Sequence, residues 1–184
     1  EKYDLAEKYY LIAVKNNNID AVNNLGLLYD NQEKYVLAEK YYLMAVKEND
    51  INAMYNLGLL YDYQKKYNLA EKYYLMAIKN NDNSAMYNLA LLYDNQEKYD
   101  LAEKYYLMAI KENHINAINN LGVLYNNQEK YVLAEKYYLL AIKNNNIDAT
   151  YNLGLLYYNQ EKYELAEKYL KMAAEQGDKN AKSL

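Results

Sequence analysis

The chain repeats itself every 32 residues, and this period constrains its fold more than any other feature. The repeated word opens at six alanines: Ala21, Ala53, Ala85, Ala117, Ala149 and Ala181. A period of this length is typical of one supersecondary unit stacked on copies of itself, in which each unit contacts only its neighbours. Such an array presents a long surface. The sequence therefore indicates a protein that holds other molecules, and it does not name the molecule held.

Each unit is expected to be a pair of helices. In residues 53–84, Ala53 and Leu57 belong to one apolar stripe at helical spacing, and Ala70 and Tyr74 belong to a second stripe after a short link. The sequence has no proline and only five glycines, which favours continuous helices joined by very short turns. The period therefore predicts a helix hairpin in every unit.

The ends of the helices carry their own signals. A residue that caps helices well precedes each opening alanine, and we expect the first helix of each unit to begin there. These predicted N-caps are Asp20, Asn52, Ser84, Asn116, Asp148 and Asn180. The second helices end in asparagines such as Asn80 and Asn81, which tolerate the left-handed conformation found after a helix C-terminus.

A glycine inside the first helix predicts a close crossing of the two helices. Gly58 costs about 1 kcal/mol relative to alanine in a helix interior. That cost makes sense if the partner helix leaves no room for a side chain there. Ala90 replaces the glycine in one unit, so the position requires a small residue and not a positive φ.

The period also sets the expected domain organisation, which is a single solenoid domain. Residues 1–20 are expected to be the second helix of a truncated leading repeat. The five full repeats are expected at residues 21–52, 53–84, 85–116, 117–148 and 149–180, followed by a C-terminal stub at 181–184. Lys171 stands where earlier units have leucine, as expected of a capping repeat with a polar outer face.

The composition argues against several classes of function. The net charge of −4 gives no attraction to nucleic acid or to an acidic membrane, and no apolar run approaches the ~20 residues that span a bilayer. The chain has no cysteine, which leaves the compartment open, and His114, in a predicted turn, is its single histidine. We therefore expect no metal site, no cofactor and no enzymatic activity, because no nucleophile with a neighbouring base is present.

The repeated word also resembles a known family. Its pattern A-x3-L-G-x2-Y-x5-Y-x2-A-x3-Y-x2-A is filled by Ala21, Leu25, Gly26, Tyr29, Tyr35, Ala38, Tyr42 and Ala45. This pattern resembles the tetratricopeptide repeat and the related Sel1-like repeat, although the period is two residues short and the proline between units is missing. The resemblance covers essentially the whole chain. It implies an all-α fold, a right-handed α-solenoid of stacked antiparallel helix hairpins.

In such repeats the first helices line a concave groove that receives a peptide or a helix of a partner. The specialised clamp for C-terminal carboxylates uses asparagine directly after the helix glycine, where this chain has leucine or valine, so that clamp is not expected. Aliphatic anchors, tyrosine hydroxyls and carboxylates suit an apolar or mildly basic peptide. The predicted groove residues are Asn23, Leu27, Asp30, Tyr55, Leu59, Asp62, Tyr87, Leu91, Asp94, Asn119, Val123, Tyr151 and Leu155. The alternative is that the leucine row is buried between neighbouring first helices and the acids are solvated helix ends.

A second apolar row is expected on the second helices, among lysines. A row of exposed leucines there would mark a lateral interface, whereas the alternative is a ladder of leucines packed within one chain. Its residues are Leu43, Leu75, Leu107 and Leu139. A further row, of asparagines such as Asn56 and Asn88, has two readings as well: it either binds peptide backbone or joins neighbouring helices.

The sequence thus predicts a non-catalytic protein–protein interaction scaffold that binds an extended or helical segment of another protein. Its alternative is a structural repeat protein that self-associates through the leucine row or its open N-terminal end, and so forms a homo-oligomer. The lysine row of the second helices, for example Lys72 and Lys104, is expected to be a solvated face and not a phosphate-binding site.

Overall fold

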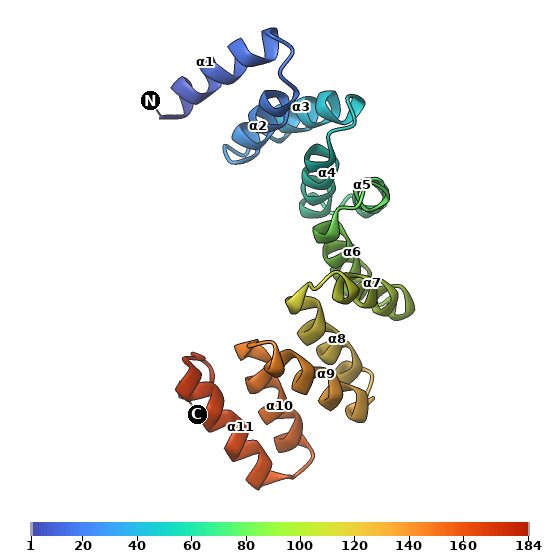
Figure 1. Ribbon diagram of the computed structural model, residues 1–184, viewed down its shortest axis with the longest axis vertical. Helices are drawn as coiled ribbons and strands as arrows, with labels where there is room; N and C mark the ends of the chain where they lie inside the picture. Colours follow the sequence, from blue (N-terminus) through green and yellow to red (C-terminus); the bar gives the residue numbers. More distant parts are fainter. Residues whose placement is uncertain (1, 184) are drawn as a thin grey trace. The chain divides into compact units, whose positions relative to one another are not determined.

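The computed structural model describes residues 2–183, and every regular element in that part of the chain is helical (Figure 1). The α-helices are α1 (Lys2–Lys15), α2 (Ile19–Asp30), α3 (Tyr35–Lys47), α4 (Ile51–Tyr63), α5 (Tyr67–Lys79), α6 (Asn83–Asn95), α7 (Tyr99–Lys111), α8 (Ile115–Asn127), α9 (Tyr131–Lys143), α10 (Ile147–Asn159) and α11 (Tyr163–Gln176). A short 3₁₀ turn, η1 (Ala181–Ser183), follows them. The predicted all-α fold is confirmed.

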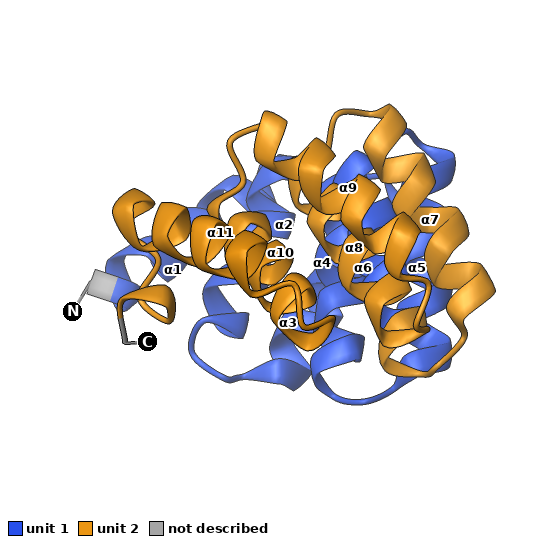
Figure 2. Ribbon diagram, turned by 90° about the horizontal axis from the view of Figure 1, so that it is seen from below, with its two compact units in different colours: residues 1–92 blue, residues 93–184 orange. Residues whose placement is uncertain are grey.

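The chain divides into two compact units, residues 1–92 and residues 93–184 (Figure 2). In the first unit, α2 packs on α3 and α4 packs on α5, while α3 also contacts α4 and α1 contacts α2. In the second unit, α8 packs on α9 and α10 packs on α11, while α7 contacts α8 and α9 contacts α10. Consecutive helices therefore pack as pairs, as the repeat predicts.

The core of the hairpins contains buried alanines and, in all but the last hairpin, one large tyrosine on the second helix. Tyr42, Tyr74 and Tyr138 are almost completely buried on the second helices. A Cβ atom placed on Gly58 would lie 2.6 Å from the Cδ1 atom of Tyr74, and Gly26 has the same relation to Tyr42. The glycine is thus the point where the tyrosine ring meets the backbone of the first helix, which confirms the predicted close crossing.

The predicted helix starts are wrong by two residues. Each first helix begins earlier, and the cap is the residue three positions before the opening alanine. Asn18 Oδ1 accepts a hydrogen bond from the Ala21 amide at 2.9 Å, and Asp50 Oδ1 accepts one from the Ala53 amide at 2.7 Å. The reason is geometric, because an N-cap side chain reaches the amide two or three residues ahead. Residues such as Asp20 lie inside the first turn instead.

The turns between helices use the left-handed conformation at two places in each repeat. The asparagines after the second helices adopt it as predicted, for example Asn49 with φ of 61° and Asn81 with φ of 66°. The turns inside the hairpins also use it, at residues that do not usually favour it. These are Glu33, Lys65, Glu97, Glu129 and Glu161. This second set was not predicted.

Successive hairpins are joined by hydrogen bonds from tyrosine to glutamate. The Tyr61 hydroxyl donates to Glu39 Oε1 of the preceding repeat at 2.8 Å. The Tyr157 hydroxyl donates to Glu135 Oε1 at 2.9 Å in the second unit. Each is a charge-assisted bond, stronger than one between neutral groups. The many tyrosines of this chain therefore supply both the core and polar links between repeats.

Candidate interaction surfaces

The predicted groove residues form one stripe on each first helix. On α4 these are Tyr55, Leu59 and Asp62, which follow one another at the i, i+4 and i+7 positions of one helix face. Leu27 on α2 is 43% exposed and Leu59 is 36% exposed. The corresponding residues Leu91, Val123 and Leu155 are half-buried. The leucine row therefore reaches the surface.

Two of the predicted groove residues are used inside the chain. The Asn56 side chain donates to Asn23 Oδ1 at 3.1 Å, and Asn152 donates to Asn119 Oδ1 at 3.0 Å. Both accepting asparagines are buried. These bonds connect one first helix to the next, so this asparagine row joins neighbouring helices.

The tyrosines of the stripe are also partly engaged. The Tyr55 hydroxyl accepts a hydrogen bond from the Asn88 side chain at 2.8 Å. Its ring lies 6.3 Å from the ring of Tyr74, centroid to centroid. Tyr55, Tyr87 and Tyr151 are all half-buried. They shape the surface around the exposed leucines and keep one ring face within the fold.

The aspartates of the stripe are half-buried next to the core tyrosines. The Tyr42 hydroxyl donates to Asp30 Oδ2 at 3.4 Å, and the Tyr106 hydroxyl donates to Asp94 Oδ2 at 3.3 Å. Burial raises the pKa of Asp30 and Asp94 above the usual value, and the tyrosine hydrogen bonds act in the opposite direction. These carboxylates are therefore partly desolvated, and the tyrosine hydroxyls offset part of the cost of their burial.

Asp62 lacks the tyrosine hydrogen bond of its counterparts. Burial raises its pKa, and no hydrogen bond offsets this. The hydroxyl of Tyr74 is fully buried without a hydrogen-bond partner in the described structure. Burial and then the charge of Asp62 raise the pKa of Tyr74, so the two groups are neighbours. Asp62 is thus a half-buried carboxylate whose oxygens are not used by the adjacent phenol.

The first helices carry negative charge and no positive charge. No lysine occurs in α2, α4, α6, α8 or α10. Their aspartates are Asp20, Asp30, Asp62, Asp94 and Asp148. All lysines lie on the second helices, on α1, in the turns or in the C-terminal segment that follows α11. Lysine is therefore absent from the first helices, whereas carboxylates occur on both sets of helices, which the total of −4 does not show.

Sequence reasoning missed two tyrosines beside this stripe. Tyr35, the first residue of α3, and Tyr63, the last residue of α4, pack with their ring centroids 5.5 Å apart. Tyr63 is 70% exposed. A signal was present in the sequence, because the other repeats have asparagine at the position of Tyr63. Those residues are Asn31, Asn95, Asn127 and Asn159.

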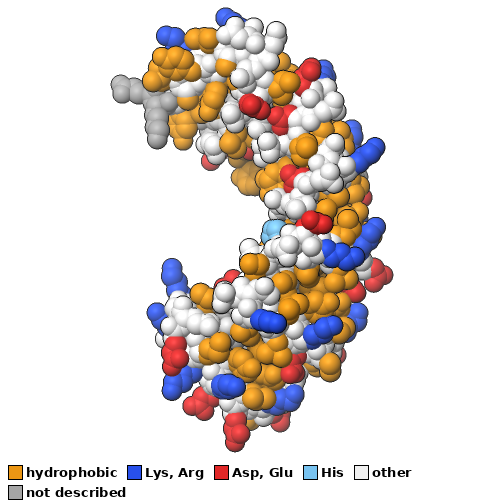
Figure 3. Space-filling model, viewed as in Figure 1, with side chains coloured by type: hydrophobic (Ala, Val, Ile, Leu, Met, Phe, Trp, Pro, Cys, Tyr) orange, Lys and Arg blue, Asp and Glu red, His pale blue; other side chains and the backbone are white. Residues whose placement is uncertain are grey.

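The leucine row of the second helices is partly exposed. Leu75 is 38% exposed and Leu139 is 40% exposed, whereas Leu43 and Leu107 are half-buried. Hydrophobic side chains gather in patches between lysines and carboxylates on the face in Figure 3. The leucines are therefore neither fully packed nor fully solvated.

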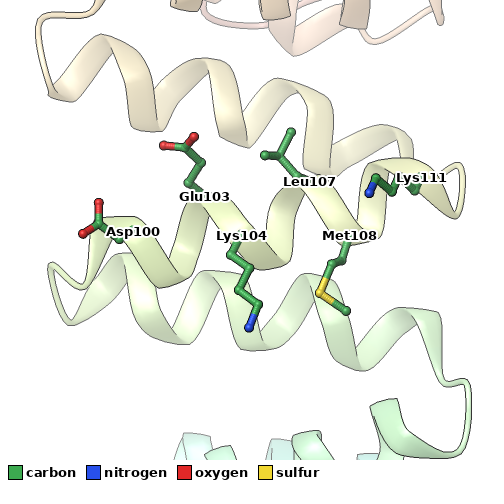
Figure 4. Close-up of a pocket in the computed structure, with 6 residues that line it drawn as sticks. All are labelled: Asp100, Glu103, Lys104, Leu107, Met108 and Lys111. Atoms are coloured by element: carbon green, nitrogen blue, oxygen red, sulfur yellow. The ribbon is translucent and has the colours of Figure 1, made fainter.

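A shallow hollow accompanies this row on α7. It has a volume of about 480 Å³ and is lined by Asp100, Glu103, Lys104, Leu107, Met108 and Lys111. Glu103 and Leu107 extend to one side of α7, and Lys104 and Met108 extend to the other (Figure 4). Similar hollows of about 450 Å³ and 390 Å³ lie on α3 and α1. Their walls combine apolar side chains with both signs of charge.

The lysines of the second helices lie over tyrosine rings. Lys72 Nζ is 5.1 Å from the ring centroid of Tyr73, and Lys66 Nζ is 5.5 Å from that of Tyr61. The same geometry holds for Lys40, Lys104, Lys136 and Lys168. His114 is at the N-cap position of α8 and is half-buried, and burial lowers its pKa. It was expected to be a solvated turn residue.

Two further searches concern metal ions and membranes. Within the described residues, no three or more histidines, cysteines, aspartates or glutamates come together as a possible metal-binding group. None of the helices described combines the length and the apolar character that a membrane crossing needs.

Comparison with known proteins identifies the repeat. The family model for the tetratricopeptide repeat matches residues 1–53, 55–118 and 127–181. A Sel1 repeat protein from Oxalobacter formigenes has a similar structure, with 25% identity, a TM-score of 0.72, and coverage of 98% of this chain and 82% of that one. A search of curated proteins finds no match.

Two other solved structures share the fold. BtubC from P. vanneervenii has a TM-score of 0.77 at 20% identity, over 96% of this chain and 91% of its own. YrrB, described as a tetratricopeptide repeat protein with an unusual peptide-binding site, has a TM-score of 0.69 at 22% identity, over 94% of each chain. Hairpin packing, repeated motif and family match agree, and the chain belongs to the tetratricopeptide repeat family.

Proposed function

We propose that this protein is a non-catalytic scaffold whose first helices bind an extended or helical segment of a partner protein. Tetratricopeptide repeats generally mediate protein–protein interaction and are generally not catalytic. The peptide-binding site named for the similar YrrB supports this use of the fold. The partner segment would lie along α2 and α4 in the first unit, or along α8 and α10 in the second.

The observation that carries this proposal is the exposure of leucine on a surface without lysine. Leu27 and Leu59 are exposed on neighbouring first helices, and half-buried tyrosines and carboxylates surround them. Apolar anchors that are ringed by polar groups are the usual composition of a protein-binding surface. The negative charge of the same helices favours a segment that is apolar and neutral to basic.

A peptide selection tests the proposal directly. A library of random peptides displayed on phage is selected on the immobilised chain, and dissociation constants of the enriched peptides are measured. Leu59→Asn should weaken binding by roughly tenfold, because it removes an apolar anchor from the contact. Leu75→Asn is the matched control, since Leu75 has a similar exposure but lies on a second helix.

The two variants separate the two surfaces. Weaker binding by Leu59→Asn together with unchanged binding by Leu75→Asn supports the first-helix surface. The opposite pattern would assign the peptide to the second helices. A library that yields no binding peptide at all would contradict the proposal.

The mixed hollows of the second helices support a second candidate, self-association. Both charges line each hollow around exposed or half-buried leucine and methionine, so two such faces can complement each other. Sedimentation velocity over a wide concentration range tests this. A dimer that disappears in Leu75→Asn combined with Leu139→Asn supports it, and a monomer at all concentrations rejects it.

A further inference from the structure

An aromatic pair in the first unit interrupts the regularity of the repeat. The rings of Tyr35 and Tyr63 are tilted by 49° with centroids 5.5 Å apart. Tyr63 is largely exposed, and it replaces the asparagine that every other repeat has. No other repeat can form this contact, because it joins the end of one first helix to the start of the preceding second helix. The pair therefore marks one place along an otherwise uniform surface.

Other tyrosine pairs in this chain show what such a pair attracts. Tyr29 and Tyr41 stack at 5.5 Å, with Lys34 Nζ 5.8 Å from the first ring and Lys40 Nζ 5.4 Å from the second. Tyr61 and Tyr73 stack at 5.6 Å and also have a lysine over each ring. Among residues 2–183 no lysine lies over Tyr35 or Tyr63. The same type of aromatic surface is thus left for a cation from outside the chain.

Carboxylates stand beside this pair. Hydrogen bonding to Tyr63 raises the pKa of Tyr35 to about 12, and burial and then the charges of Glu33 and Asp30 act in the same direction. Asp62 directly precedes Tyr63 in α4. No lysine among the described residues is within salt-bridge distance of Asp30 or Asp62. Negative charge and exposed aromatic rings therefore meet at the same ends of α2 and α4.

The buried hydroxyl of Tyr74 provides an independent indication. In the counterpart positions, Tyr42 donates to Asp30 and Tyr106 donates to Asp94. The Tyr74 hydroxyl is fully buried beside Asp62 and does not form that bond. Because the carboxylate of Asp62 accepts no hydrogen bond from Tyr74, its oxygens can accept hydrogen bonds from another donor. A half-buried charge of this kind is costly unless it is paired.

We propose that Asp30, Tyr35, Asp62 and Tyr63 form a cation subsite that takes one lysine or arginine side chain of the bound segment. The subsite rests on the proposed function, since it lies at the edge of the first-helix surface. The cationic group lies over the tyrosine rings, and the carboxylates accept its hydrogen bonds. The methylene stem then points along α4 toward Leu59, which holds the neighbouring apolar side chain.

The second unit supplies a contrast within the same chain. Tyr158 and Tyr163 also pack closely, with centroids 5.7 Å apart, and no lysine of the described structure lies over them. Tyr158 occupies the position of Asp62, however, so this second pair has no aspartate there. The hollow that Tyr158 and Tyr163 line contains Glu167 together with Lys171, whose positive charge opposes a further cation. The subsite is accordingly placed in the first unit alone.

A small probe tests the subsite without the rest of the peptide. Nα-acetyl-arginine amide is titrated into ¹⁵N-labelled protein, and Nα-acetyl-citrulline amide, of the same shape and without charge, is the matched ligand. The arginine probe should shift the amide signals of Asp62 and Tyr63, and the citrulline probe should not. Tyr63→Asn, which copies the other repeats, should weaken the arginine probe roughly threefold.

Removal of the carboxylate together with the exposed ring should have a larger effect than removal of the ring alone. Asp62→Asn copies Asn126 of another repeat and should weaken the arginine probe by about tenfold when it is combined with Tyr63→Asn. Asp148→Asn is the control, because it removes the same charge from a first helix of the second unit and copies Asn52 and Asn116. It should leave the titration unchanged.

The outcomes are distinct from those of the peptide selection. Equal shifts by both probes, shifts located elsewhere, or an equal loss in Asp148→Asn would overturn the subsite. If peptides that depend on Leu59 are selected without any enrichment of lysine or arginine, the subsite is wrong and the scaffold function stands. If the arginine probe binds at Asp62 and no peptide is selected, the subsite stands and the wider groove does not.

Discussion

The two units of this protein share the same packing of helix hairpins and differ in the charge on the surface of their first helices. At the end of the first helices, the first unit has Asp30 and Asp62. In the second unit the same position changes from Asp94 to Asn126 and then to Tyr158. The buried tyrosine of the second helix, which lies beside this position, is present in each hairpin up to Tyr138 and is replaced by Leu170 in the last hairpin. The acidic stripe therefore belongs mainly to the first unit.

The difference shows which positions the fold controls. The first helices α4, α6, α8 and α10 have the same length of 13 residues, although their stripes differ. Their buried alanines, by contrast, do not change from one helix to the next: Ala53, Ala85, Ala117 and Ala149. Because the stripe varies while the helix remains, the packing of the hairpin does not fix the stripe residues. The core also differs between the units, for example where the buried Met54 of α4 is replaced by Thr150 in α10, and at the glycine crossing.

The largest expected effect is at this crossing. Gly58→Val should destabilise the protein by about 3 kcal/mol, because a side chain there collides with the ring of Tyr74, which has no room to move. Gly154→Val should cost slightly less, because it meets the half-buried side chain of Leu170, which can change rotamer, although the backbone nitrogen of Leu170, 3.1 Å from the added Cβ atom, limits this relief. Urea denaturation followed by circular dichroism measures both. Equal costs would show that the two crossings are equally rigid.

The bonds between hairpins should be alike in the two units. Tyr61→Phe removes the hydrogen bond to Glu39, and Tyr157→Phe removes the one to Glu135. Each should cost about 1 kcal/mol, since the carboxylates are partly exposed and can turn to water. The change in urea midpoint measures this, and Tyr67→Phe is a control at an exposed tyrosine. A loss of stability in only one of the two variants would mean that the contacts between hairpins differ between the units although their sequences are alike.

The sequence predicts this packing of hairpins well because its signals are local and repeated. The spacing of alanine and tyrosine predicts the hairpins, the interior glycine predicts the close crossing, and the asparagines predict the left-handed turns. The helix starts were misplaced because Asn18 and Asp20 are both good caps. The helix is capped by the residue whose side chain reaches a backbone amide without an intrahelical partner. The order of the residues in the sequence does not show which residue this is.

The candidate site was predictable in position and not in detail. Helical spacing places residues such as Leu59 and Asp62 on one stripe. It does not show that Asn23 is buried by Asn56 of the next repeat, or that Tyr35 meets Tyr63. Both contacts join residues of different repeats, so they depend on the angle between successive hairpins. A period in the sequence does not contain that angle.

The smallest expected effect concerns the charge that distinguishes the first unit. Burial raises the pKa of Asp62 in the folded protein above its unfolded value of 3.8, so folding favours the protonated carboxyl. The stability from this group is fully present below pH 3.8 and is lost as the pH rises through the folded pKa. Asp62→Asn should therefore stabilise the protein at neutral pH by less than about 1 kcal/mol, because solvent screens a half-exposed charge.

The pH dependence separates this charge effect from a change in packing. The advantage of Asp62→Asn over the natural protein should shrink as the pH falls toward the unfolded pKa of aspartic acid, where the natural side chain is also neutral. Thermal melts of both proteins across that range measure it. Asp148→Asn, which removes a carboxylate at an exposed position, is the comparison variant. If Asp62→Asn destabilises the protein at neutral pH, then the charge of Asp62 is already compensated within the fold. In that case the cost of an unpaired carboxylate no longer supports the proposal that this unit receives a cation.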